Sequence, residues 1–252
     1  MDLGKYLSHV MESHVVFSLN IFGVEIPIFD TIIVMWIVMA IVIGLALYFT
    51  RNLKQVPEGR QNLIELYIEF VTNFTKSTLG HHAKYFVPYF GTVLLFLAIA
   101  NAVSIFSIIP SGEQLYHLTG IKFFEHIPEF EIRPPTKDIN VTVCMAIMSI
   151  ILVIGAGIRF KTFKGFLKSF LEPVPIILPF KILDYFIRPL SLSLRLFGNI
   201  LGAFIVMELI YLASNGFVIP AVFSLYFDLF DGLLQAYIFV FLTSIYVAEA
   251  IE

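Results

Sequence analysis

Three long runs of this chain contain no charged side chain, and they restrict its possible folds more than any other feature. They cover residues 31–50, 85–112 and 139–158. A helix needs about 20 apolar residues to cross the hydrocarbon core of a bilayer, and it must satisfy its backbone hydrogen bonds internally. Charged residues make up only 14% of the chain, whereas soluble domains contain about 25%. We therefore predict an all-α integral membrane protein.

Two more apolar segments follow position 179, at residues 180–214 and 218–249, and each carries isolated charges. The dipeptide Asn215-Gly216 lies between them and is typical of a tight turn, so the two segments are predicted to form a long helical hairpin. Residues 63–79 mix apolar and charged side chains, a pattern that favours an amphipathic helix in the membrane interface. The sequence thus predicts five membrane helices plus one interfacial amphipathic helix.

The distribution of basic residues predicts how the chain crosses the membrane. The connections after runs 31–50 and 139–158 contain Arg51, Lys54, Arg60, Arg159, Lys161, Lys164 and Lys168. The connection between residues 112 and 139 has fewer basic residues and several acids. Because basic residues concentrate in cytoplasmic loops, we expect the N-terminus outside and the C-terminus in the cytoplasm.

We expect one membrane domain over residues 1–252, with an external N-terminal segment (1–28), peripheral helices (29–172) and the C-terminal hairpin (173–252). The first residues lack the basic start and compact apolar core of a cleavable signal peptide, so we expect them to be retained. The single cysteine, Cys144, lies in an uncharged run, where we expect it to pack as a small apolar residue.

Arg195 is the residue of the hairpin that most needs an explanation. Every other residue from Leu190 to Met207 is uncharged. An arginine keeps its charge at any ordinary pH, and in hydrocarbon that charge costs at least roughly 2.5–3.5 kcal/mol. An ionisable residue at this depth is a functional-site hypothesis by default, and its partner has to be found.

Polar side chains recur at helical spacing on both arms of the hairpin. The first arm carries Lys181, Asp184, Arg188, Ser191, Arg195 and Asn199. The second carries Ser224, Asp228, Asp231 and Gln235. Antiparallel packing of the arms could bring the two lines together.

Two interpretations compete for these charges. In the first, Arg195 pairs with Asp228 or Asp231, and a salt-bridge network holds the hairpin together. In the second, the carboxylates relay an ion while Arg195 supplies a fixed positive charge. Both remain open from the pattern alone.

The charge count favours the ion path. Asp184 can neutralise Arg188 or Lys181, each about one turn away. Glu208 lies thirteen positions after Arg195, on nearly the opposite face of the helix, so it is a poor partner. Arg195 is therefore predicted to face a charge that its own helix does not supply.

The segments RPLSLSLRLFGN (188–199) and QAYIFVFLTSIY (235–246) resemble subunit a of bacterial F-type ATP synthases, and the lead-in EPVPIILP (172–179) extends the resemblance. The resemblance implies a tilted hairpin in the bacterial inner membrane, packed against a rotating ring of c subunits and held by the b subunits of the peripheral stalk. It implies an ion-translocating subunit of the H⁺-transporting complex, with no enzyme activity of its own.

The same resemblance implies a role for each polar residue. Arg195 would be the electrostatic separator that faces the rotor carboxylate, lowers the pKa of that carboxylate and opposes direct leakage between two offset half-channels. Asn199 and Gln235 would orient Arg195 or line the outer access path. Asp228 would be the entry-side relay, and Asp231, one turn further along, is a second candidate.

The resemblance also assigns the cytoplasmic side of the path, and this chain departs from the family pattern at two positions. Asp184 would face the exit, or else pair structurally with Arg188. Glu208 would be a compensating acid or a packing residue. Phe204 and Lys181 stand where some relatives carry acids, so the outer relay would run through Asp228 and the exit chemistry differs.

Other function classes receive less support. The chain has no phosphate-binding glycine loop, nucleophile elbow or metal-ligand cluster, so we expect no cofactor, metal or bound nucleotide. Its net charge of -3 gives no reason to expect nucleic acid. The alternatives are a self-contained membrane transporter or ion channel, which predicts broken helices and a midplane cavity, and a membrane scaffold. The residues leave H⁺ and Na⁺ equally open as the ion.

Overall fold

The computed structural model describes residues 15–21, 24–51, 53–103, 134–169, 175–213 and 218–252. Its elements are β1 (Val15–Ile21), β2 (Val24–Phe29), α2 (Asp30–Thr50), α3 (Arg60–Leu79), η1 (Gly80–His82), α4 (Ala83–Ala102), η4 (Pro135–Lys137), α6 (Ile139–Ser169), η5 (Pro175–Ile177), α7 (Leu178–Ala213), α8 (Val218–Ser224), η6 (Leu225–Asp231) and α9 (Gly232–Ile251). The predicted turn at residues 215–216 and the end of the run 85–112 lie outside the described residues.

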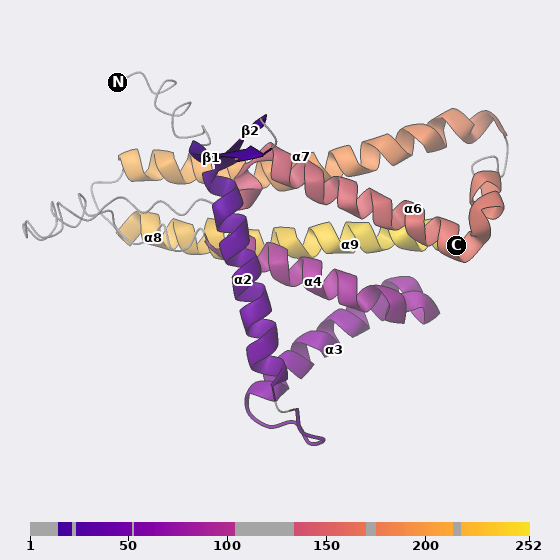
Figure 1. Cartoon of the computed structure of the whole chain (residues 1–252), viewed down its shortest axis with the longest axis horizontal. Helices are drawn as coiled ribbons and strands as arrows, with labels where there is room; N and C mark the ends of the chain where they lie inside the picture. Colours follow the sequence, from indigo (N-terminus) through magenta and orange to yellow (C-terminus); the bar gives the residue numbers. More distant parts are fainter. Residues whose placement is uncertain (1–14, 22–23, 52, 104–133, 170–174, 214–217) are drawn as a thin grey trace, which may run out of the picture.

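The prediction of an all-α membrane protein with five spanning helices is confirmed. Among the described residues, the stretches long and apolar enough to span a membrane are Asp30–Thr50, Arg60–Ala102, Ile139–Ser169, Leu178–Met207 and Val222–Ile251. The amphipathic segment predicted at residues 63–79 is α3, which continues through η1 into α4. Gly80 has a φ of +53° at this junction, a backbone conformation that glycine adopts readily, and Figure 1 shows α3 and α4 meeting there at an angle.

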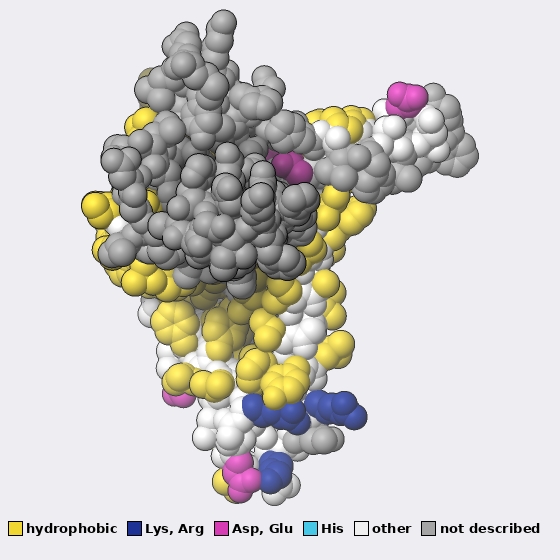
Figure 2. Space-filling model, turned by 90° about the vertical axis from the view of Figure 1, so that its left-hand side faces the viewer, with side chains coloured by type: hydrophobic (Ala, Val, Ile, Leu, Met, Phe, Trp, Pro, Cys, Tyr) yellow, Lys and Arg dark blue, Asp and Glu magenta, His cyan; other side chains and the backbone are white. Residues whose placement is uncertain are grey.

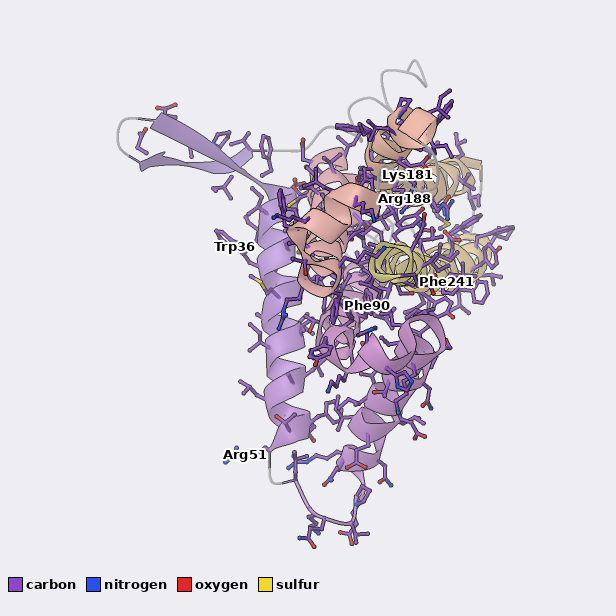
Figure 3. All side chains as sticks on the ribbon, turned by 90° about the vertical axis from the view of Figure 1, so that its right-hand side faces the viewer. Trp36, Arg51, Phe90, Lys181, Arg188 and Phe241 are labelled. Carbon is purple, nitrogen blue, oxygen red and sulfur yellow. The ribbon has the colours of Figure 1, made fainter. Side chains whose placement is uncertain are left out.

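Four helices form the body of the molecule. In Figure 1, α4, α6, α7 and α9 run alongside one another, while α2 stands steeply across them. The core between them includes Phe90, Leu97, Val153, Leu196 and Phe239, and Figure 3 labels Phe90 inside the bundle. These helices pack on one another because each buries an apolar face.

Helix α2 has little protein around it. Trp36 is 49% exposed and points away from the bundle in Figure 3. Below the grey residues, Figure 2 shows a band of hydrophobic side chains, and lysine and arginine side chains gather near the lower end of the molecule. Arg51, Lys54 and Arg60 are exposed at the junction of α2 and α3. An apolar surface that ends in basic residues is the pattern expected of a helix that crosses a bilayer.

Three local features were not predicted. The N-terminal segment contains a small antiparallel sheet, β1–β2, in which Ser18 pairs with Pro27. Its residues are mostly β-branched or aliphatic, which favours strands. The last helix, predicted as continuous, is π-helical over Leu225–Asp231. Cys144 is exposed on α6 rather than packed in the core, because α6 turns a different face toward its neighbours, with Ala146, Ser149 and Val153 buried.

Candidate functional site

Arg195 lies on the outer face of α7. The inner face of this helix buries Leu192, Leu196 and Ile200, which follow each other at intervals of four residues. Residues at that spacing share one side of a helix. Arg195 and Asn199 lie along the edge of this buried side rather than within it, and both are exposed. Within the described part of the chain, no ion pair or hydrogen bond involves the Arg195 guanidinium.

Asn199 connects the exposed face to the interior of the hairpin. Its Nδ2 donates a hydrogen bond of 2.8 Å to Oε1 of Gln235 on α9. The Gln235 side chain is only 1% exposed, so this amide is the point where the two polar lines of the hairpin meet. The pair holds α7 and α9 together one turn of helix after Arg195.

The acids of the second arm lie in and beside the π-helical stretch η6. Asp231 closes this stretch and is partly exposed. The side chains of Asp228 and Glu208 lie outside the described part of the structure. The i→i+5 hydrogen bonds of a π-helix widen each turn, and such stretches are frequent at functional sites. The α-helical spacing from which the sequence aligned Asp228 with Gln235 therefore does not apply over η6.

Two consecutive buried hydrogen bonds hold the end of η6 in place. Asn101 Nδ2 donates to the Gly232 carbonyl oxygen at 2.9 Å, and the Thr136 hydroxyl donates to Asn101 Oδ1 at 2.7 Å. A Cβ atom at Gly232 would lie 2.9 Å from the Asn101 Cβ, so only glycine permits this approach. Sequence reasoning missed Asn101, although a lone amide in the uncharged run 85–112 was a visible signal.

The opposite end of the hairpin corrects one expectation. Arg188 Nη2 pairs with Glu249 Oε1 of α9 at 2.7 Å, and its guanidinium lies 5.0 Å from the centre of the Tyr246 ring. Among the described residues, no salt bridge joins Arg188 to Asp184. Arg188 reaches across to α9, whereas Asp184 stays on the exposed face of α7.

Lys181 does not pair with Asp184 in the described contacts either. Its Nζ donates to the Ser169 carbonyl oxygen at 2.5 Å. Lys181 and Arg188 are labelled in Figure 3, where both lie near the beginning of α7. Both cations that the sequence assigned to Asp184 thus have contacts elsewhere, and the carboxylate of Asp184 faces outward.

Phe204, which stands where some relatives carry an acid, packs against a cation. Lys137 Nζ lies 3.6 Å from the centre of the Phe204 ring, and Lys137 is 8% exposed. A cation held over an aromatic face with little water is worth about 2 kcal/mol. The sequence places Lys137 only in the connection between residues 112 and 139, because nothing in its context predicts that η4 inserts between the helices.

Two adjacent histidines, His81 and His82, follow Gly80 at the end of α3. His81 and His82 lie exposed in η1, and the His82 ring packs 4.6 Å from the Phe160 ring, centre to centre. Within the described residues, no group of three or more histidine, cysteine, aspartate or glutamate side chains could hold a metal ion.

Comparison with known proteins agrees with this geometry. The family model described as ATP synthase A chain matches residues 32–248, from the beginning of α2 nearly to the end of α9. The ATP synthase subunit a of Propionigenium modestum, described as sodium ion specific, is 35% identical over 225 residues, which cover 89% of this chain and 75% of that protein. The chain therefore belongs to the subunit a family of F-type ATP synthases, whose members translocate ions and are not catalytic by themselves.

Proposed function

We propose that this chain is the stator half of a rotary ion motor, in which the face of α7 that carries Arg195 contacts the carboxylates of a rotating c ring. The observation that carries the proposal is the exposed guanidinium, for which the described residues offer no acid. A permanent cation in a membrane span is stable only beside a counter-charge or water. The ring carboxylate is the counter-charge that the family membership implies.

The charge of Arg195 determines where the ring carboxylate releases its ion and where it binds the next one. A ring carboxylate that turns into lipid must be neutral, because a bare charge in hydrocarbon costs several kcal/mol. Beside Arg195 the opposite charge favours the ionised form of that carboxylate, so the ion leaves on one side and another is captured on the other side. The fixed positive charge also opposes direct passage of cations between the two half-channels.

The remaining polar residues define two offset access paths. On the outer side, Asp228 and Asp231 of η6 would pass the ion toward the Asn199–Gln235 pair. On the cytoplasmic side, Asp184 would receive it. Asp184 precedes Arg195 by eleven residues, which corresponds to about 16 Å along a helix at 1.5 Å per residue. The two paths therefore would end at different depths on either side of Arg195.

The proposed assembly follows from the same reasoning. The partners are the c-ring subunits, the b subunits of the peripheral stalk and the lipid bilayer, with the N-terminus outside and the C-terminus in the cytoplasm of a bacterial inner membrane. The name of the Propionigenium modestum relative specifies sodium. For this chain both H⁺ and Na⁺ fit, because the ring carboxylate and its surroundings bind the ion.

Replacing Arg195 by alanine tests the proposal in membrane vesicles that contain the assembled complex. We expect Arg195→Ala to abolish ATP synthesis driven by an ion gradient and to leave the complex assembled. Arg51→Ala is the matched control, since Arg51 is an exposed arginine at the end of α2. Coupled synthesis retained by Arg195→Ala would contradict the motor, whereas loss of assembly would favour the scaffold interpretation.

A further inference from the structure

Helix α6 does not run straight to its end. Thr162 has a φ of +66°, which breaks the helical backbone and divides the last turns from the span. In Figure 1 the end of α6 turns away beside the C-terminus, close to the beginning of α7. We call residues 162–169 the reversed segment.

Phe166 holds the reversed segment in a fixed orientation. Its side chain is 8% exposed, and its ring lies so close to Gly157 that a Cβ atom there would be 2.6 Å from it. The contact is possible because glycine has no side chain. Because Phe166 is fixed in this way, the exposed side chains of the reversed segment keep a constant orientation relative to the bundle.

That surface is amphipathic. Phe163 is 61% exposed and Leu167 is 51% exposed, and residues four apart share one side of a helix. Lys164 and Lys168, also four apart, are exposed beside them. An exposed aromatic and aliphatic edge next to a lysine edge is typical of helices that lie in the membrane interface.

The reversed segment and the three residues before it carry charge of one sign, and the first acid that follows them in the sequence is Glu172. Between Asp138 and Glu172 the sequence contains four basic residues, Arg159, Lys161, Lys164 and Lys168, and no acid. From the neighbouring α9, the Glu249 carboxylate is paired with Arg188. Basic clusters that directly follow a membrane span attract anionic lipids, and the charge here is complementary to such headgroups.

We propose that the reversed segment is a membrane anchor for anionic phospholipids. Phe163 and Leu167 insert at the level where acyl chains meet headgroups, and the lysines bind the headgroup phosphates. The segment ends the span Ile139–Ser169, on the side that the basic residues assign to the cytoplasm. This lipid contact does not depend on the proposed ion path.

A single-tryptophan form of the full chain tests the anchor. Trp36 is the only tryptophan, so Trp36→Phe combined with Phe163→Trp places one reporter on the reversed segment. We expect its fluorescence to be quenched by lipids with brominated acyl chains, and at least twofold more by phosphatidylglycerol than by phosphatidylcholine at equal mole fraction. Lys164→Gln with Lys168→Gln should bring this ratio to about one.

Ile151 provides the matched control, because it is 63% exposed on the same helix and has no basic neighbour. A tryptophan there should be quenched equally by both lipids. The proposal is overturned if position 163 is quenched by neither lipid, or equally by both. A photoreactive benzoylphenylalanine at position 163 extends the test to the assembled complex. We expect an adduct with phosphatidylglycerol. An adduct with another protein overturns the anchor, as does the absence of any adduct at position 163 when the same photoreactive residue at position 151 yields one.

Discussion

The hydrogen bond between Asn199 and Gln235 allows a quantitative prediction. The two amides join α7 to α9 at 2.8 Å, and Gln235 is 1% exposed. In Asn199→Ala the buried Gln235 carbonyl oxygen loses this donor. A buried polar group left unpaired costs about 1–3 kcal/mol, so we expect a loss of about that size in the free energy of unfolding.

A double-mutant cycle isolates the bond itself. The cycle combines Asn199→Ala with Gln235→Met, which keeps the volume and removes the amide. Side-chain hydrogen bonds within membranes contribute about 0.6 kcal/mol on average and at most about 1.7 kcal/mol. The coupling energy between Asn199 and Gln235 should therefore be above zero and no larger than about 1.7 kcal/mol. The assay is unfolding by sodium dodecyl sulfate in mixed micelles.

The control for this cycle is Asn73, an exposed asparagine on α3. Asn73→Ala should leave the free energy of unfolding within about 0.5 kcal/mol of the parent, as expected of surface substitutions. A coupling energy indistinguishable from zero, or equal destabilisation by Asn73→Ala and Asn199→Ala, would refute the reasoning.

Three further substitutions have defined expected outcomes. Gly157→Ala should displace the Phe166 ring and destabilise the chain by about 1–3 kcal/mol in the same unfolding assay. Gly155→Ala is the control and should not destabilise it, because a Cβ there meets nothing within 4 Å. Equal effects of the two substitutions would contradict the contact between Gly157 and Phe166. Asn101→Leu removes the hydrogen bonds of a buried amide to Gly232 and Thr136. It should lower the free energy of unfolding by at least about 1 kcal/mol, and an unchanged unfolding curve would contradict this expectation. Asp228→Asn should slow ATP synthesis and shift its dependence on external pH, and an unchanged profile would remove Asp228 from the ion path.

The sequence predicted the parts of the molecule that depend on local pattern. The uncharged runs identified the helices because hydrocarbon excludes charge over the whole length of a span. The spacing of Asp184, Arg195 and Asn199 placed them on one face of α7, since helical periodicity holds along an uninterrupted helix. All three are exposed in the structure.

The parts that depend on contacts between distant segments could not be predicted in this way. The partner of Arg188 is Glu249, which is 61 positions away in the sequence, whereas the spacing rule compares only residues of one helix. The π-helical hydrogen bonds of η6 leave no mark in the apolar periodicity. The insertion of Lys137 beside Phe204 depends on how η4 packs among the helices, which composition does not encode.

Cross-linking from Gly198 tests the central claim most directly, namely that the face of α7 around Arg195 contacts another polypeptide. Gly198 lies three residues after Arg195 and is exposed, and a Cβ there meets no atom within 4 Å. A photoactivatable thiol reagent on Gly198→Cys, in a Cys144→Ser background, should join the assembled chain to a c-ring subunit near its mid-membrane carboxylate. The control Ile151→Cys should yield lipid adducts. Lipid adducts alone from position 198 would contradict the proposed contact.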